Sequence, residues 1–422
     1  MKKLIFKILK IVALLVLQKQ RPQIITVTGS VGKTSTKQAF CLVLAKKFSV
    51  RGGAKNYNNE LGVPLAILGL ESPRKSIIGW LKLFAKALGL ILFKKNNYPE
   101  ILILEIGADK PGDLKYLMEM IPNGLLRVAV LTAVAPVHLE FFGSMENIFQ
   151  EKIYPFFCLA KDGLAVVNQD NCDASRIKEA IHSAMITYGV KGQSDVIIKN
   201  LKQTNDGLAF QLVEGGQTLD FFLPGGMGFH QVYPLLAAVA VGVFYEITLE
   251  EIAQNLTDYT PPPGRMRRLK GKGDSLIIDD TYNSSPESCK RALETLSSMP
   301  KAKRRIAVLG DMLELGETSE EFHKAMGQIA GRLKIDYIIT YGQMAQFMAK
   351  GAQESGLSKE RIFSFSDLQK ISNFLKKFIQ KGDMLLVKGS QGMRMEKIVK
   401  DIMAQPEKAK DLLARQSEGW DN

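Results

Sequence analysis

The stretch that decides this fold is Thr28-Gly29-Ser30-Val31-Gly32-Lys33-Thr34-Ser35. The β-branched run at 24–27 just before it is typical of a strand buried on both faces. Residues 34–47 just after it lack Gly and Pro, so they predict a helix. A strand, a glycine turn and a helix N-terminus cradle phosphate, because backbone N–H groups and the helix dipole face the anion. We therefore predict a nucleotide phosphate site at Gly29, Ser30, Val31, Gly32, Lys33, Thr34 and Ser35.

Two side chains of this stretch have the chemistry of a nucleotide site. Lys33 would reach the terminal phosphates as a point charge, and the Thr34 hydroxyl would ligate Mg²⁺. Position 27 is Val, so the stretch has the shorter T-G-x-x-G-K-T form of the phosphate loop. The alternative is a glycine turn with a solvated lysine, which gives the Lys-Thr pair little structural reason.

Length and composition limit the class of protein. A chain of 422 residues suggests two or three domains, and 46% hydrophobic and 23% charged residues are ordinary for a globular protein. Four scattered cysteines without a C-x-x-C pair favour a reducing compartment, so we expect a cytoplasmic protein. The net charge is +13, but no basic stripe is interleaved with aromatics. A negatively charged membrane surface or an anionic substrate fits this charge better than nucleic acid.

Two apolar segments rich in lysine stand out, at 1–21 and 76–95. The uninterrupted apolar run in the first, 11–17, is far shorter than the ~20 residues of a membrane-spanning helix. No small-residue cleavage site follows, which argues against a signal peptide. Each segment could lie in a bilayer interface or pack on its own protein. We hypothesise a peripheral contact with the inner face of the plasma membrane.

Apolar runs that end in polar residues predict an α/β fold. We expect a central P-loop ATPase domain with a mainly parallel sheet over 22–262, into which 76–95 is inserted. A small antiparallel piece is expected at 195–223. The stiff linker at 261–265, Pro-Pro-Pro-Gly-Arg, marks the boundary to a smaller Rossmann-like domain over 263–403. Residues 404–422 read as a charged, poorly packed tail.

Polar side chains follow several of the predicted strands. Ligands of open α/β sheets bind at the carboxyl ends of the strands, so these side chains should converge on a nucleotide site between the two domains. They are Lys33, Glu105, His138, Asp280, Asp311 and Lys388. Glu105 and His138 are the candidate partners of Mg²⁺, although histidine is an unusual ligand for it. A glycine-rich loop at 52–64 carries Asn56, Asn58 and Asn59, which either donate amides to a substrate or form a turn cluster.

The sequence resembles the Mur ligase family over nearly all of residues 24–400, and the matching segments come in the same order as in that family. The matching segments are TGSVGKTST (28–36), NYNNELGVP (56–64), EIGADKPGD (105–113), VHLEFFGS (137–144), PGR (263–265), DDTYNSSP (279–286), VLGDMLELG (308–316) and VKGSQGMRME (387–396). DDTYN and LGDMLELG are the specific ones. The chain is most similar to the members that add D-alanyl-D-alanine to a muramoyl-tripeptide.

The resemblance implies an ATP-dependent amide ligase of peptidoglycan precursor synthesis, working through an acyl phosphate. It implies that Lys33 holds the phosphates, that Thr34 and Glu105 hold one Mg²⁺ and that His138 holds a second. It places Asp280, Tyr282 and Asn283 at the nucleotide, Arg265 at the hinge and Lys388 on the substrate side. Lys152 matches a lysine whose carbamate helps to ligate the second ion in similar enzymes; a solvated helix lysine is the alternative.

Several positions depart from the family's pattern. Tyr154 stands where Glu is usual, Pro234 occupies the region where an Asn approaches the adenine, and Gln391 replaces an Arg. Only about twenty residues precede the ATP strand, where similar enzymes begin with a uridine-binding domain of the size of a small fold. Another protein could bind the uridine nucleotide instead, or the substrate could differ from the usual soluble uridine-linked one. Two alternatives therefore stay open: a Mur-like ligase acting on another or a lipid-linked carboxylate, and a non-catalytic ATP-binding scaffold at the membrane.

Overall fold

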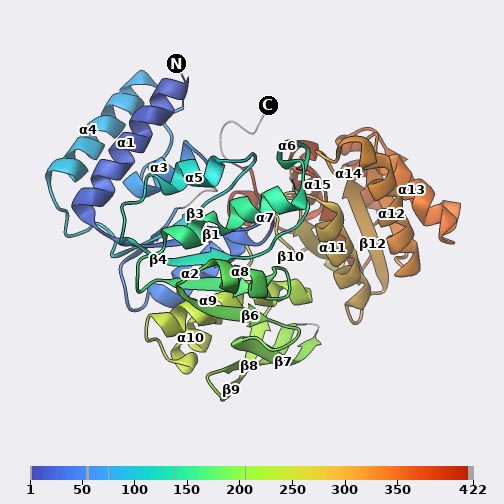
Figure 1. Ribbon diagram of the computed structural model, residues 1–422. Helices are drawn as coiled ribbons and strands as arrows, with labels where there is room; N and C mark the ends of the chain where they lie inside the picture. Colours follow the sequence, from blue (N-terminus) through green and yellow to red (C-terminus); the bar gives the residue numbers. More distant parts are fainter. Residues whose placement is uncertain (1, 54–56, 75, 138, 205, 417–422) are drawn as a thin grey trace. The chain divides into compact units, whose positions relative to one another are not determined.

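The computed structural model describes residues 2–53, 57–74, 76–137, 139–204 and 206–416 (Figure 1). The chain divides into two compact units. One comprises residues 1–200, 210–221 and 232–259, and the other comprises residues 201–209, 222–231 and 260–422. The prediction of an α/β fold with a large, mainly parallel sheet and a second, smaller sheet is confirmed.

Strand β1, which leads into the glycine turn, lies inside the larger sheet. It pairs in parallel with β3 on one side and β4 on the other, so that Val27 stands opposite both Glu105 and Val130. Within the described residues this sheet has nine strands, in the order β2-β3-β1-β4-β5-β6-β7-β8-β9. Their bounds are β1 Gln23–Thr28, β2 Val50–Gly52, β3 Ile101–Glu105, β4 Leu126–Leu131, β5 Leu164–Asn168, β6 Ala184–Gly189, β7 Val196–Gln203, β8 Gly207–Glu214 and β9 Gln217–Pro224.

Alternate residues of the central strands are buried on opposite faces, as a sheet covered on both sides requires. Ile24, Leu102 and Ala129 join a core under helices α1, α3, α4, α5, α7 and α8. Helices α2, α9 and α10 pack together, and of these α2 contacts β1–β3 and α9 contacts β5 and β6. The helix bounds are α1 Lys2–Gln20, α2 Lys33–Leu44, α3 Gly62–Leu68, α4 Ile77–Leu92, α5 Asp113–Met118, α6 Leu139–Phe142, α7 Met145–Ile153, α8 Ala174–Ala180, α9 Val232–Phe244 and α10 Leu249–Leu256.

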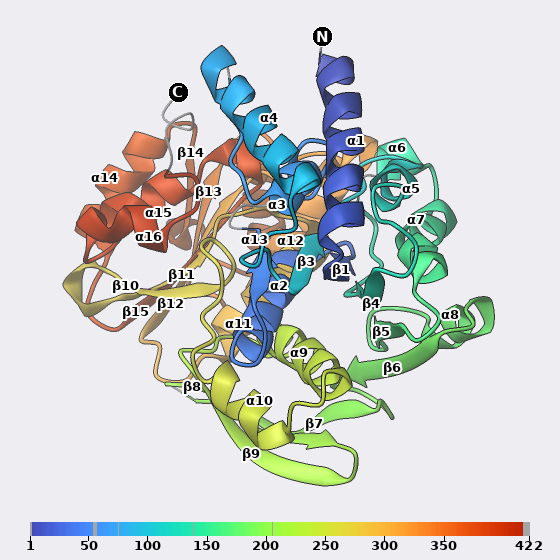
Figure 2. The same cartoon turned by 90° about the vertical axis from the view of Figure 1, so that its left-hand side faces the viewer.

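The two lysine-rich segments form helices α1 and α4, which lie side by side in both views (Figures 1 and 2). Each buries one face in the core of the first unit, through Leu9 and Val16 on α1 and through Leu83 on α4. Among the described residues, none of the helices has both the length and the apolar content needed to cross a bilayer.

The second sheet is parallel except at one edge. Among the described residues it has six strands in the order β10-β11-β15-β12-β13-β14, and only β10 runs antiparallel to its neighbour. Ile278 and Leu386 face a core under α11–α13, whereas Ile277 and Leu385 face a core under α14–α16. The bounds are β10 Arg267–Lys270, β11 Leu276–Asp280, β12 Arg304–Gly310, β13 Tyr337–Tyr341, β14 Ile362–Phe365, β15 Asp383–Lys388, α11 Pro286–Ser298, α12 Ser319–Arg332, α13 Ala345–Glu354, α14 Leu368–Phe378, α15 Glu396–Ile402 and α16 Ala409–Leu412.

Two expectations from the sequence are wrong in detail. The helix expected at 34–47 begins at Lys33 and ends at Leu44, because the N–H groups of Lys47 and Phe48 both turn back to the Leu44 carbonyl before β2 starts. In the tail expected to be poorly packed, the described part, 404–416, packs on the second unit. Ala409 and Leu413 are buried in the core under α14–α16, so the charged composition of this segment hid its apolar anchors.

Candidate active site

The glycine turn after β1 needs glycine for two separate reasons. Gly29 has φ +142°, and a Cβ there would lie 2.1 Å from the Thr132 Oγ1, closer than atoms can approach. Gly32 has φ +86° and is the N-cap of α2. The Thr132 hydroxyl fixes the two ends of the turn, because it lies within hydrogen-bond distance of the carbonyls of Thr28, at 3.1 Å, and Val31, at 2.5 Å. A tight glycine loop is thus built at the N-terminus of α2, where the first N–H groups of a helix have no acceptor within the helix.

Lys33 and Ser30 extend from this loop. The Lys33 ammonium donates a hydrogen bond to the Gly29 carbonyl at 2.6 Å, so its positive charge lies directly over the loop. The Ser30 hydroxyl donates to the Ala135 carbonyl at 3.0 Å and accepts from the Ala135 N–H at 2.9 Å. The predicted phosphate loop is therefore tied to the segment that follows β4.

The Glu105 carboxylate meets the start of α2. It ends β3 with 3% of its surface exposed, and the Thr34 hydroxyl lies 3.1 Å from its Oε1 and 3.0 Å from its Oε2. The Lys37 ammonium approaches Oε2 at 3.4 Å and donates to the Gly53 carbonyl at 2.9 Å. Asn58 Nδ2 lies 3.5 Å from Oε1. A hydroxyl and a carboxylate at this spacing are the hard oxygen donors that Mg²⁺ takes.

The asparagines of the 52–64 loop have different roles. The Asn58 side chain faces Glu105, and the backbone carbonyl of Asn58 accepts a hydrogen bond from the Gly107 N–H at 2.7 Å. The Asn59 side chain instead accepts from the N–H groups of Leu61 at 3.3 Å and Gly62 at 2.9 Å, so it fixes the entry to α3. Asn56 lies outside the described residues, as does His138, the predicted ligand of a second ion.

Lys152 is a buried lysine on α7. It is 2% exposed, so the alternative of a solvated helix lysine is wrong. Burial and the nearby Lys33 charge lower the pKa of Lys152 to about 7, although Glu151 and Asp109 raise it. Burial therefore favours the neutral amine of Lys152 over its ammonium form.

The second unit brings together another predicted set. At the end of β11, Asp280 Oδ2 accepts a hydrogen bond from Lys388 at 2.6 Å, and Asp280 Oδ1 accepts from the Met266 N–H at 3.0 Å. The same Lys388 ammonium donates to the Asn283 carbonyl at 3.0 Å and is 2% exposed. Lys388 therefore fixes both the carboxylate and the loop that carries Tyr282.

Arg265 and Tyr282 form a stacked pair. The Arg265 guanidinium lies 4.1 Å from the centre of the Tyr282 ring, and Arg415 lies 5.1 Å from it. Arg415 also donates to the carbonyls of Thr281, at 3.1 Å, and Tyr282, and to the buried Glu396 at 3.1 Å. Asp311, in contrast, accepts from the Ala345 N–H at 2.6 Å and fixes the start of α13.

Comparison with known proteins agrees with this geometry. The Mur ligase middle domain matches residues 84–242, and the domain described as "Mur ligase, glutamate ligase domain" matches residues 264–391. The UDP-N-acetylmuramoyl-tripeptide–D-alanyl-D-alanine ligase of Bacillus subtilis (strain 168) is 31% identical over 391 residues, covering 92% of this chain and 78% of its own length. The chain belongs to the Mur ligase family. It is accordingly an ATP-dependent ligase.

Solved structures of Mur ligases have the same fold. The MurF ligase of Thermotoga maritima, solved in complex with ADP, superposes with a TM-score of 0.77 and 28% identity, covering 96% of this chain and 84% of that one. MurF of Acinetobacter baumannii also gives a TM-score of 0.77, with 25% identity and coverage of 93% and 79%. The counterpart from Escherichia coli (strain K12) is 28% identical over 389 residues, covering 91% of this chain and 78% of its own length.

Four site residues of this Mur ligase were missed by sequence reasoning. Lys37 lies one helical turn after Lys33, and that i+4 spacing was the signal available for it. Thr132 follows a strand run directly. Arg415 and His230 gave no signal, because their surroundings come from distant parts of the chain. Burial lowers the pKa of His230 to about 4, together with the charges of Arg291 and Lys388, although nearby Asp280 raises it.

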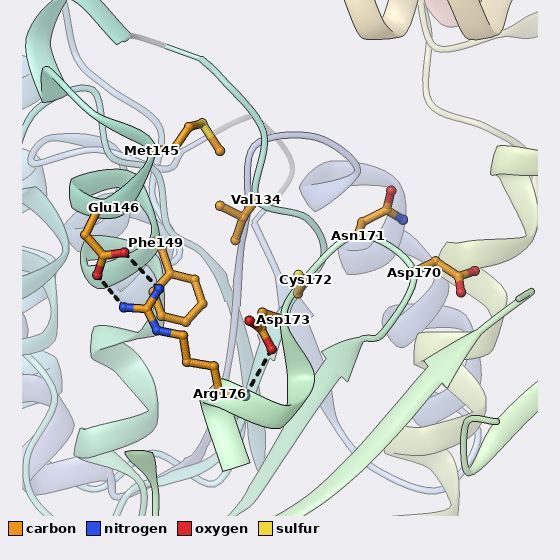
Figure 3. A pocket seen from close by; sticks show the side chains of 9 residues that line it. All are labelled: Val134, Met145, Glu146, Phe149, Asp170, Asn171, Cys172, Asp173 and Arg176. Atoms are coloured by element: carbon orange, nitrogen blue, oxygen red, sulfur yellow. Dashed lines mark hydrogen bonds and ion pairs between the residues drawn. The ribbon is translucent and has the colours of Figure 1, made fainter. Parts of the chain in front are cut away.

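A hollow of about 390 Å³ lies beside α7 in this Mur ligase (Figure 3). Its polar groups are already paired: Arg176 binds Glu146 and stacks 4.2 Å from the centre of the Phe149 ring, and Asp170 accepts from Tyr233 at 2.9 Å. These contacts make the hollow a structural feature of the first unit. It is lined by Val134, Met145, Glu146, Phe149, Asp170, Asn171, Cys172, Asp173 and Arg176.

Proposed function

We propose that this ligase joins D-alanyl-D-alanine to the carboxylate of a muramoyl-tripeptide, with conversion of ATP to ADP and phosphate. The observation that carries the proposal is the cluster of Lys33, Thr34 and Glu105 beside the glycine loop, in a chain whose relatives bear the name of this reaction. A carboxylate must approach a triphosphate, so the main barrier is charge repulsion. Cations and positioning are expected to supply most of the catalysis.

The nucleotide triphosphate would lie along residues 29–35. The loop amides and the N-terminus of α2 offer donors and a positive dipole to the phosphates. The Lys33 ammonium, which hydrogen-bonds to the Gly29 carbonyl at 2.6 Å, would move by a small side-chain rotation onto the terminal phosphates. From the second unit, Asp280, Tyr282, Asn283 and Arg265 would contact the nucleotide, and Lys388 would position Asp280 and Asn283.

A divalent cation fits the oxygen pair at the start of α2. Thr34 and Glu105 would hold Mg²⁺, and the Lys37 ammonium lies 3.4 Å from Oε2 of the same carboxylate. When bound, the ion would neutralise phosphate charge. Asn58 lies within reach of the same carboxylate and would steer its orientation.

Lys152 is suited to carry a carbamate. Its neutral amine would attack carbon dioxide and form an N–C bond as one C=O bond becomes a single bond, and the loss of one proton from nitrogen would leave an anionic carbamate in place of a neutral amine. Together with His138, that carbamate would coordinate a second cation. ATP turnover measured with and without added bicarbonate would test this role. Bicarbonate should raise the turnover of the native chain and leave the residual turnover of Lys152→Gln unchanged.

Phosphate release tests the proposed reaction directly. ATP turnover is measured with the muramoyl-tripeptide alone, with D-alanyl-D-alanine alone and with both, and Lys33→Met serves as the matched inactive control. Release that requires both substrates supports the proposal. Nucleotide binding with no release under any condition would favour the scaffold alternative. Release with another amine or with a lipid-linked carboxylate only would assign a different Mur-type substrate.

A further inference from the structure

Helices α1 and α4 lie side by side (Figure 2), and each exposes a row of large apolar side chains. On α1 the row follows the spacing i, i+4, i+7, i+11 along one helical face, from Leu4 to Leu15. On α4 the equivalent stripe runs from Ile78 to Leu92. We call this surface the α1–α4 face, and its members are Leu4, Ile8, Ile11, Leu15, Ile77, Ile78, Leu81, Leu88, Leu92 and Phe93.

The α1–α4 face is unusual within this protein. Nineteen large apolar side chains are strongly exposed in the described chain, and ten of them belong to this face. Ile77 is 77% exposed and Leu81 is 66% exposed. Scattered exposed apolar residues are normal, but a contiguous group on two adjacent helices marks an interaction surface.

The two helices are held firmly by their other sides. Leu9 and Leu17 of α1 and Ala87 of α4 are buried in the core of the first unit. Gln20, at the end of α1, donates to the carbonyls of Leu90 at 2.5 Å and Phe93 at 2.8 Å, so it caps the last turn of α4. The exposed stripes are therefore outward faces of a fixed pair of helices.

The charge of the two segments that form this surface indicates the kind of partner that it would bind. Residues 1–21 and 72–99 contain twelve of the chain's 56 Lys and Arg residues and none of its 43 Asp and Glu residues. The rest of the chain holds 44 basic and 43 acidic residues, so it is almost neutral. Nearly all of the net charge of +13 belongs to the two segments that form the apolar surface.

Most of the described lysines of these segments are available to an external anion. Lys10 binds Glu119 at 2.5 Å and lies 4.0 Å from the centre of the Tyr116 ring, which directs it toward its own protein. The others make no ion pair with any described residue, and they are Lys7, Lys19, Lys82, Lys86, Lys94 and Lys95. On α4, Lys82 and Lys86 flank the apolar stripe, in position to reach headgroups while the stripe meets acyl chains.

We propose that the α1–α4 face docks this ligase on the surface of a bilayer rich in anionic lipid. Apolar side chains enter the boundary between headgroups and acyl chains, and the lysines pair with lipid phosphates. A second copy of the chain is a poorer occupant, because two surfaces that carry only positive charge repel each other. The inference stands independently of the proposed substrates.

Vesicle flotation tests the inference. The full chain is floated with phosphatidylcholine vesicles and with vesicles that contain phosphatidylglycerol, at low and at high salt. We expect binding to the anionic vesicles only, falling at least tenfold from 0.05 to 0.5 M salt because screening weakens the headgroup contacts. Lys82→Gln and Lys86→Gln should each lower partitioning roughly fivefold.

Apolar substitutions provide the decisive comparison. Ile11→Glu and Leu81→Glu should abolish flotation, whereas Phe222→Glu, at a residue of β9 that is 42% exposed, should leave it unchanged. Unchanged ATP turnover in dilute buffer would show that each variant is folded. Flotation that survives Leu81→Glu, or absent flotation of the native chain at low salt, would overturn the proposal. So would a dimer that both substitutions dissociate without any vesicle binding, since this face would then be a self-association surface.

Fluorescence gives a second measurement that does not depend on flotation. The chain has two tryptophans, Trp80 on α4 and Trp420, so Trp420→Phe leaves Trp80 as a single reporter. Trp80 is half-buried beside the face and lies 6.0 Å from Phe84, ring centre to ring centre. Anionic vesicles with brominated acyl chains should quench it. Equal emission with brominated and ordinary anionic vesicles would contradict the insertion of α4.

Discussion

The hydroxyl of Thr34 lies 3.0 Å from Oε2 of Glu105, where the first turn of α2 meets the end of β3. The two residues are 71 positions apart in the sequence, and the parallel pairing of β1 with β3 brings them together. The contact joins the phosphate loop to a buried carboxylate. A hydroxyl and a carboxylate at this spacing are oxygen donors of the kind that Mg²⁺ takes, and the cation site proposed above rests on them.

Removing the Thr34 hydroxyl should weaken the use of Mg²⁺. We expect Thr34→Val to lower ATP turnover about a hundredfold and to shift half-saturation toward higher Mg²⁺ concentration. Thr34→Ser keeps the hydroxyl and should retain turnover within a few-fold. Phosphate release measured over a Mg²⁺ titration checks both. An unaltered titration curve for Thr34→Val would remove Thr34 from the cation site.

Gly29 should not tolerate a side chain. Gly29→Ala would place a Cβ 2.1 Å from Thr132 Oγ1, so we expect a loss of about 3 kcal/mol in the free energy of unfolding. Gly124→Ala is a matched control, since Gly124 also has positive φ but nothing lies within 4 Å of the added atom. That variant should lose only about 1 kcal/mol. Equal urea midpoints for the two variants would argue against the tight turn.

Lys152 should make stability depend on pH in an unusual direction. Its pKa of about 7 lies below the ordinary 10.5, so the folded state binds the proton more weakly than the unfolded state. The buried ammonium of Lys152 therefore lowers the free energy of unfolding. This destabilisation is complete below pH 7 and disappears as pH rises from 7 to 10.5. We expect Lys152→Met to raise the free energy of unfolding by roughly 2 kcal/mol at pH 6, with little change near pH 10.5. Turnover should be lost.

The control for Lys152 is Lys152→Arg, which stays charged at every pH and should be less stable than the native chain throughout. Urea unfolding from pH 6 to 10 compares the three proteins. A lower stability of Lys152→Met at pH 6 would show that the buried ammonium is better solvated than its surroundings indicate.

The Lys388–Asp280 pair should be strongly coupled. Lys388→Met leaves the Asp280 carboxylate with the Met266 N–H as its remaining hydrogen-bond donor among the described residues, and we expect a loss of about 3 kcal/mol in the free energy of unfolding. Adding Asp280→Asn should recover part of the loss, because a neutral amide is less costly to bury. Urea unfolding of both single variants and the double variant gives the coupling energy. Strict additivity would mean that the two groups act separately.

The glycine turn between β1 and α2 and the strand-end positions of the candidate site residues could be predicted from the sequence, because these features are local. A glycine turn before Lys-Thr, or a carboxylate after an apolar run such as 101–104, can be found in a short window. The buried state of Lys152 and the packing of 404–416 depend on distant segments. Arg415 reaches Thr281 across 134 positions, and no periodicity encodes that contact.

The most direct test of the central claim follows an oxygen atom. The muramoyl-tripeptide is labelled with ¹⁸O in its reacting carboxylate and incubated with the ligase, ATP and D-alanyl-D-alanine, and the released phosphate is examined by mass spectrometry. If the carboxylate attacks the γ-phosphorus and the amine then displaces phosphate, one labelled oxygen must pass to each phosphate. Phosphate without label would mean that water attacks ATP directly, and it would contradict the proposed ligase reaction.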